Sequence, residues 1–200
     1  NVTQAIQHSC NYFFYMMGYY LGNGNKNVVD NEKGLNLLKK YADSYGLTSA
    51  SGVEVPEADP SFSDIDVVRS SIGQGTHSYT PSQLSRYVTT LANKGKNYKL
   101  TLVDKVKNTK TGKTKKNKAT VTGKMDLKTS TVNAIRVGMK NVVSDGSISP
   151  LFKDLNVIVA GKTGTAQINA NQPNHALFVS YAPYEDPEIS VTVQIPNGFT

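Results

Sequence analysis

Hydrophobic residues recur at helical spacing through the first 150 residues of the chain. Apolar positions three or four residues apart predict four helices, within residues 3–21, 30–46, 80–95 and 130–143. We expect a break in the first helix at the small polar cluster of residues 9–11. Asp30 can cap the second helix, and Thr80 followed by Pro81 is a strong start for the third. This part of the chain is therefore predicted to be a mainly helical lobe.

The pattern changes after Pro150. Short runs rich in β-branched and aromatic residues, separated by turn-forming segments, predict strands at residues 157–160, 176–181 and 189–195. Helices grouped first and antiparallel strands grouped last favour an α+β fold. We expect one partial domain over residues 1–200, with the helical lobe over residues 1–150 and the sheet over residues 151–200.

The net charge of +7 comes from one segment. Residues 94–128 hold 12 Lys against Asp104 and Asp126, a local charge of +10. β-Rich residues flank a polar turn there, which predicts a Lys-coated hairpin over about residues 96–124. Nucleic-acid sites usually use Arg forks and stacked aromatics, but this segment has no Arg and only Tyr98. We therefore expect solvated surface and no nucleic-acid partner, with polyanion contact as the open alternative.

Other composition signals exclude several classes of protein. No run approaches 18 apolar residues, so no membrane-spanning helix is expected in this chain. A single cysteine, Cys10, excludes an internal disulfide framework, and we expect it to be a small buried filler. His8, His77 and His175 are isolated, so neither a metal site nor a cofactor is expected.

Two further segments are interpreted as structural. The aromatic and Met-rich run of residues 12–20 has helical spacing and is predicted to pack in the core. Residues 71–75 are predicted to form a turn that leads into the helix beginning at Pro81.

Two short motifs suggest chemistry. The first is Ser9-Cys10-Asn11 at the predicted helix break, which by itself is typical of a helix cap or turn. The second is the run from Gly161 to Ala166, Gly-Lys-Thr-Gly-Thr-Ala, which directly follows a predicted strand. A lysine, two hydroxyls and close-approach glycines beside a strand suit the binding of a carboxylate. A P-loop is excluded because the earlier glycine of that motif is absent and a strand-like segment follows Lys162.

In this order, Ser-x-Asn and Lys-Thr-Gly resemble two of the three signatures of the penicillin-recognising serine enzymes. Further blocks make nearly the whole chain, from Ala5 to about Asn197, similar to the transpeptidase domain of class B penicillin-binding proteins. The blocks are residues 9–14, 52–57, 71–75 with 80–84, 160–167 and 178–187. The resemblance implies a β-lactamase/transpeptidase-like α+β fold that contributes the last three strands of a five-stranded antiparallel sheet.

The third signature, a Ser followed three residues later by Lys, is absent, because no Ser in the sequence has Lys at that offset. In the family this element supplies the acylated nucleophile and its base, and it precedes Ser-x-Asn. We therefore expect the chain to be a fragment, incomplete at both ends and inactive alone. The resemblance places the nucleophile in the missing N-terminal part of the same protein.

The resemblance implies acyl transfer through the serine of the Ser-x-x-Lys element, and it assigns supporting roles to three residues of this chain. Ser9 would relay a proton to the leaving nitrogen and stay hydrogen-bonded to the catalytic lysine of the absent segment. Asn11 would bind the amide of the donor peptide and help to hold that lysine. Lys162 would supply positive potential that favours the substrate carboxylate and keeps the neighbouring lysine able to act as a base.

Three residues of the second motif are implied to bind substrate. The hydroxyls of Thr163 and Thr165 would hold the carboxylate, and Gly164 would let the substrate approach closely. The backbone N–H of Thr165 would form half of the oxyanion hole, and the absent serine would form the other half.

The resemblance also implies partners and a location. Peptidoglycan stem peptides and β-lactam antibiotics would bind the site, and cell-wall synthesis machinery would associate with the protein. The family is bacterial and acts at the extracytoplasmic face of the cell membrane, through an anchor outside this chain. A β-lactamase, a D,D-carboxypeptidase and a non-catalytic β-lactam sensor remain alternatives.

Overall fold

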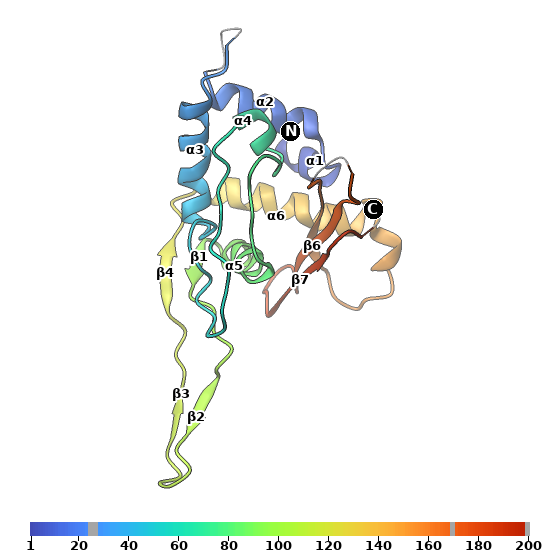
Figure 1. The fold of residues 1–200 in the computed structure, drawn as a ribbon. Helices are drawn as coiled ribbons and strands as arrows, with labels where there is room; N and C mark the ends of the chain where they lie inside the picture. Colours follow the sequence, from blue (N-terminus) through green and yellow to red (C-terminus); the bar gives the residue numbers. More distant parts are fainter. Residues whose placement is uncertain (24–27, 169–170, 199–200) are drawn as a thin grey trace.

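The computed structural model describes residues 1–23, 28–168 and 171–198 (Figure 1). The helices are α1 (Val2–Gln7), α2 (Asn11–Leu21), α3 (Asn31–Ser44), α4 (Val67–Ser70), α5 (Pro81–Ala92), α6 (Thr129–Ser144) and the 3-10 helix η1 (Ser149–Leu151). The strands are β1 (Lys96–Tyr98), β2 (Lys105–Lys107), β3 (Thr114–Lys116), β4 (Val121–Lys124), β5 (Ala160–Ala166), β6 (His175–Ala182) and β7 (Ile189–Ile195). The predicted α+β class is confirmed.

Local capping explains where the predicted helices begin. The Asp30 carboxylate accepts the backbone N–H of Lys33 at 2.9 Å and starts α3. Thr80 and Gln83 form a reciprocal capping box at α5, next to Pro81. The predicted break between α1 and α2 is present, and Ser9 lies there with a left-handed φ of 49°. These helices are therefore encoded largely by local sequence.

The sheet is antiparallel, in the order β5-β6-β7. β5 pairs with β6 from Ala160 opposite Tyr181 to Ala166 opposite His175. The predicted strand at residues 157–160 is wrong, since the strand begins only at Ala160. Pairing with β6 extends the strand through lysine and glycine residues that have low β-propensity, so tertiary contacts override the local preference. The Lys-Thr-Gly motif is therefore part of the strand itself.

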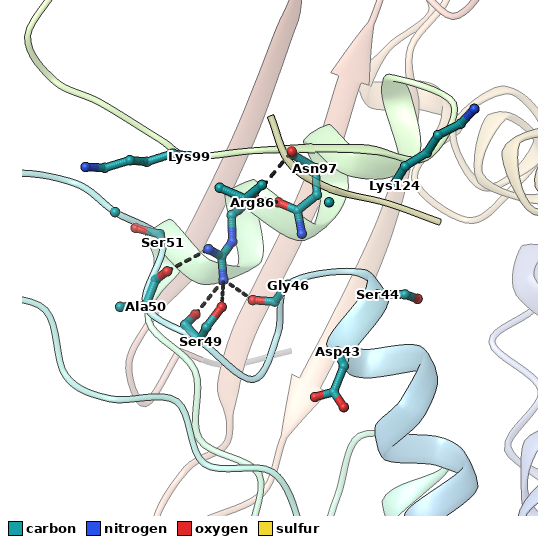
Figure 2. Close-up of a pocket in the computed structure, with 13 residues that line it drawn as sticks. Asp43, Ser44, Gly46, Ser49, Ala50, Ser51, Arg86, Asn97, Lys99 and Lys124 are labelled. Atoms are coloured by element: carbon teal, nitrogen blue, oxygen red, sulfur yellow. Dashed lines mark hydrogen bonds between the residues drawn. The ribbon is translucent and has the colours of Figure 1, made fainter. Parts of the chain in front are cut away.

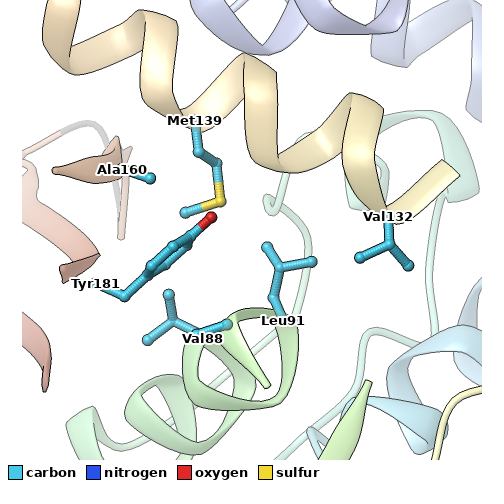
Figure 3. Packing of buried hydrophobic residues seen from close by; sticks show 7 residues of the cluster. Val88, Leu91, Val132, Met139, Ala160 and Tyr181 are labelled. Carbon is cyan, nitrogen blue, oxygen red and sulfur yellow. The ribbon is translucent and has the colours of Figure 1, made fainter. Parts of the chain in front are cut away.

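The core lies where α5 and α6 pack against the sheet (Figure 3). Its buried residues are Val88, Leu91 and Ala92 from α5, Val132 and Met139 from α6, and Ala160 and Tyr181 from β5 and β6. Arg136 of α6 is only 4% exposed and donates to the carbonyl oxygens of Ala92 at 3.3 Å and Tyr184 at 2.5 Å. Its guanidinium also stacks over the rings of Tyr181 and Tyr184, so one buried cation joins the helices to the sheet.

Helix α1 packs closely on α6. A Cβ on Gly138 would lie 2.9 Å from Cβ of Ile6, so only glycine permits this approach of the two backbones. Thr3 Oγ1 adds a hydrogen bond of 3.2 Å to the carbonyl of Ala134. These contacts fix the end of α1, and therefore the place of Ser9, against the core.

The lysine-rich segment forms two antiparallel pairs, β1 with β4 and β2 with β3. The β2–β3 hairpin extends far from the rest of the molecule in Figure 1, and all residues of both strands are exposed. Lys105 lies directly opposite Lys116 in the register. Like charges therefore face each other across this arm.

Two predictions about the first motif's surroundings are wrong. Residues 12–20 are not core, because Tyr12 is 74% exposed, Met17 43% and Tyr20 60%. Only Gly18 of α2 is buried, since this helix packs on α3 and α4 along one face. Cys10 is half-buried and occupies the N-cap position of α2, so it is not a buried filler either.

Candidate active site

A cavity of about 760 Å³ separates the helical lobe from β5. All six site residues expected from the sequence line it: Ser9, Asn11, Lys162, Thr163, Gly164 and Thr165. The first two come from the break between α1 and α2, and the other four are consecutive residues of β5. The fold thus brings the two motifs to opposite walls of one cavity, although about three-quarters of the chain lies between them.

Ser9 and Lys162 join these walls directly. Lys162 Nζ donates to Ser9 Oγ at 2.5 Å and to the carbonyl oxygen of Thr163 at 2.8 Å. Ser9 adopts its left-handed conformation between the backbone bonds Ser9 N–H to Ile6 O and Cys10 N–H to Ala5 O. For a non-glycine residue this conformation is costly and persists only where the surroundings enforce it. The end of α1 thereby holds the Ser9 hydroxyl at the lysine.

The charge of Lys162 is held in a partly desolvated place. Burial disfavours the charged form and lowers the pKa of Lys162 below the ordinary lysine value of 10.5. In the described part of the chain the ion pairs are Lys39 with Asp43 and Arg69 with Asp66, so Lys162 has no carboxylate partner there. A cation with neutral partners and reduced hydration is suited to binding an anionic group from outside the chain.

The edge of β5 presents backbone groups to the cavity. The carbonyl oxygens of Thr163 and Thr165 accept from side chains rather than from β6, namely from Lys162 Nζ at 2.8 Å and Gln74 Nε2 at 3.2 Å. N–H and C=O of one strand residue point to the same edge, so the N–H groups of Thr163 and Thr165 face this edge too. β5 is the terminal strand of the described sheet. The edge can therefore pair with an extended ligand.

Sequence reasoning missed the loop between α4 and α5 as a part of the site. Ser71, Ile72 and Gln74 line the cavity, whereas residues 71–75 were interpreted as a structural turn only. The inner wall is also largely apolar, lined by Ile6, Phe14, Met17, Tyr45, Tyr87, Ile135 and Met139. No motif spacing marks these residues, because they come together only through the packing of five helices.

A second cavity, of about 340 Å³, surrounds Arg86 (Figure 2). Arg86 is 4% exposed and donates to the carbonyl oxygens of Gly46, Ser49 and Ala50. Lys99 and Lys124 extend away from the guanidinium in Figure 2. Arg86 therefore holds the loop after α3, and the cationic groups of this cavity do not converge on a ligand position.

Comparison with known proteins gives the same assignment as the motifs. The family model of the penicillin binding protein transpeptidase domain matches residues 1–199. The chain belongs to this family. A curated relative, the peptidoglycan D,D-transpeptidase MrdA of Haemophilus influenzae, is 26% identical over 99% of the chain and 33% of its own length.

Solved structures show the same fold. Penicillin-binding protein 2B of Streptococcus pneumoniae strain R6 superposes with a TM-score of 0.84 at 26% identity, covering 98% of this chain and 35% of its own. A Helicobacter pylori penicillin-binding protein, PBP2, solved in complex with MreC, has a TM-score of 0.76 at 24% identity, over 99% of this chain and 36% of its own. The relatives are class B penicillin-binding proteins, so the resemblance read from the motif blocks is confirmed.

The chain spans about a third of the length of the relatives that it matches. None of the helices in residues 1–23, 28–168 and 171–198 is both long and apolar enough to cross a membrane. The same residues contain no cluster of three potential metal ligands among His, Cys, Asp and Glu.

Proposed function

We propose that this chain forms two of the three motif walls of a D,D-transpeptidase active site that cross-links peptidoglycan stem peptides and binds β-lactams. The observation that carries the proposal is the 2.5 Å hydrogen bond between Lys162 and Ser9, which joins two motifs 153 residues apart inside one cavity. Family membership over residues 1–199 supports the reaction class. A Ser-x-x-Lys segment outside these 200 residues supplies the nucleophile.

The reaction is acyl transfer in two steps. The serine oxygen forms a bond to the carbonyl carbon between two D-alanines, the C–N bond breaks, and the serine proton passes to the departing amine of D-alanine. An amine of a neighbouring stem peptide then attacks the acyl carbon and forms the new amide, while the ester bond between this carbon and the serine oxygen breaks and the amine proton passes to the serine oxygen. A β-lactam follows only the first step, with its ring C–N bond as the one that breaks.

Ser9, Asn11 and Lys162 serve proton movement and charge. The Ser9 hydroxyl already accepts from Lys162, and it can donate in turn to the leaving nitrogen as this nitrogen gains its proton. Asn11, the first residue of α2, places a neutral carboxamide at the cavity to bind the donor amide and the lysine of the absent segment. The desolvated cation of Lys162 attracts the ligand carboxylate.

Thr163, Gly164 and Thr165 form the binding wall. The two threonine hydroxyls hold the carboxylate, and Gly164 keeps this part of the strand free of a side chain. The N–H of Thr165 faces the cavity edge and stabilises the oxyanion. One such donor contributes roughly 100- to 1,000-fold to the rate in serine hydrolases.

The place of the protein in the cell follows from the same family. We propose a bacterial protein that is anchored in the cell membrane by a segment outside this chain and acts at the extracytoplasmic face. Stem peptides and β-lactams are its ligands. Contact with cell-wall synthesis machinery is supported by the Helicobacter pylori relative that was solved with MreC.

The test is covalent labelling of the full-length protein with a fluorescent penicillin, followed by measurement of the release rate. Stable labelling, reduced when Lys162 is replaced by Met, is the expected result. Absence of labelling would overturn the proposal and leave a non-catalytic domain. Rapid release of the label would instead identify a β-lactamase, and release of D-alanine without cross-linking would identify a carboxypeptidase.

A further inference from the structure

Gln74 makes a hydrogen bond across the cavity. Its Nε2 donates to the carbonyl oxygen of Thr165 at 3.2 Å, which links the loop between α4 and α5 to the edge of β5. Gln74 is half-buried, and it lines the cavity together with Thr165. The Gln74 carboxamide therefore occupies a backbone acceptor on the edge of β5.

The occupied oxygen is the one that an extended ligand would use. Thr165 directs its carbonyl away from β6 and into the cavity, and β5 is the terminal strand of the described sheet. A peptide that adds to a strand edge places a backbone N–H on each outward carbonyl. The carboxamide N–H of Gln74 has the same donor chemistry as that peptide N–H. Ligand and Gln74 therefore compete for one acceptor.

The backbone around Gln74 is fixed, so the competition concerns its side chain. Gly73 and Gly75 have φ values of 81° and 97°, and a Cβ on Gly75 would lie 2.5 Å from Ser63 Oγ. Ser63 is itself held by Ser70 Oγ at 2.7 Å, and its N–H donates to His77 Nδ1 at 3.0 Å. This network holds the turn in place, so release of the Thr165 carbonyl requires only a rotamer change of the Gln74 side chain.

We propose that Gln74 is a specificity-determining placeholder: it occupies the Thr165 carbonyl in the free protein, and a ligand with a correctly placed amide N–H must displace it. The inference rests on the proposed function, because it assigns the ligand to the same edge. Its ligand class is an extended peptide, or an acylamino β-lactam, with an N–H directed at Thr165. Ligands without this N–H leave Gln74 in place and gain nothing from its removal.

The test compares the full-length protein with Gln74→Ala and Gln74→Met, the second of which keeps the length of the side chain without a donor. Gln194→Ala is the matched control, since Gln194 is also half-buried and is not among the residues lining the cavity. Isothermal titration with an N-acetylated peptide that ends in a single D-Ala, and therefore lacks the bond that the serine cleaves, measures binding without acylation. Both Gln74 variants should bind about three- to tenfold more tightly, the range of one hydrogen bond, and the control should be unchanged.

Acylation kinetics provide the second measurement. With benzylpenicillin, Gln74→Ala should raise the acylation rate constant, whereas an analogue with an N-methylated side-chain amide should react equally with variant and wild type. Equal or weaker peptide binding by both variants would overturn the proposal and show that Gln74 braces Thr165. If the wild type is not acylated by either compound, the proposed function fails, and the peptide titration still decides the role of Gln74.

Discussion

Lys162 and the lysines of the β2–β3 hairpin carry the same side chain in opposite surroundings. Lys162 is half-buried, fixed by Ser9 Oγ and by a backbone carbonyl, and has a lowered pKa. Lys105 and Lys116 are exposed and face each other across the hairpin, at the far end of an arm that leaves the body (Figure 1). One cation is held in a defined geometry, and the others are surrounded by water.

The difference shows that charge count does not locate function in this chain. The segment of residues 94–128 carries more than the whole net charge, with 12 Lys and two Asp. Water and salt screen such exposed charges, so each contributes little to a specific contact. A single lysine contributes more to ligand binding when it is partly desolvated and held by fixed neighbours, because its charge then interacts more strongly with an anionic ligand.

The strongest test of the comparison removes each kind of lysine in the full-length protein. Lys162→Met should slow acylation by a penicillin about 100- to 1,000-fold, because the cavity loses the cation that attracts the carboxylate and holds Ser9. Replacement of Lys105, Lys107, Lys115 and Lys116 together by Gln should leave the rate within about twofold. A large loss in the quadruple variant would mean that the hairpin takes part in binding.

Arg136 extends the comparison to a fully enclosed cation. Arg136→Met leaves the carbonyls of Ala92 and Tyr184 without their donor inside the core, and should lower the free energy of unfolding by about 3 kcal/mol. Arg69→Met, at an exposed ion pair, is the control and should change it by less than about 1 kcal/mol. Urea denaturation measures both. Equal effects would show that burial of Arg136 is not what stabilises the contact between helices and sheet.

The pH dependence of ligand binding sharpens the comparison further. Burial lowers the pKa of Lys162 below the ordinary lysine value of 10.5. The affinity for a carboxylate ligand is therefore highest below the lowered pKa, where Lys162 is protonated. It falls as the pH rises through that pKa, which happens before pH 10.5. Above the lowered pKa the loss approaches about tenfold per pH unit. Lys162→Arg should move the fall to higher pH, because a guanidinium keeps its proton there. Titration of a peptide that ends in a single D-Ala, between pH 7 and 11, measures this pH dependence, and an unchanged profile in the Arg variant would assign the fall to another group.

The smallest expected effect concerns the hairpin alone. Lys116→Glu places a carboxylate opposite Lys105 and should stabilise the β2–β3 pairing by about 0.2–1 kcal/mol at low salt. Amide hydrogen exchange of the hairpin measures it, and the gain should vanish in 1 M salt. Lys110→Glu, at the turn and outside the paired register, is the control. A gain that persists in high salt would point to a cause other than charge.

Local signals account for what could be predicted. Asp30 and Thr80 mark helix starts because their side chains cap the first turn, whatever the rest of the fold does. The start of β5 could not be found, because pairing with β6 rather than local propensity extends the strand through Lys162 and Gly164. The exposure of Tyr12 depends on which face of α2 packs on its neighbours, which a single helical pattern does not specify.

The site was predictable for a different reason. Ser9, Asn11 and the Lys-Thr-Gly residues were identified by the resemblance of ordered motifs, and the structure adds the contact that joins them. Gln74 has no such signal, since a glutamine between two glycines fits any turn. Its role depends on the distance to a carbonyl 91 residues further along the chain.

The close contact of Gly138 with Ile6 has a consequence for the shape of the cavity. Helix α6 packs against both α1 and β5, so the elements that bear the two motifs share one supporting helix. The distance between Ser9 and Lys162 therefore depends on how closely α1 and β5 pack on α6. A bulkier residue at position 138 would increase the distance between Ser9 and Lys162. It would thereby slow acylation by a ligand, although it contacts no residue of the two motifs.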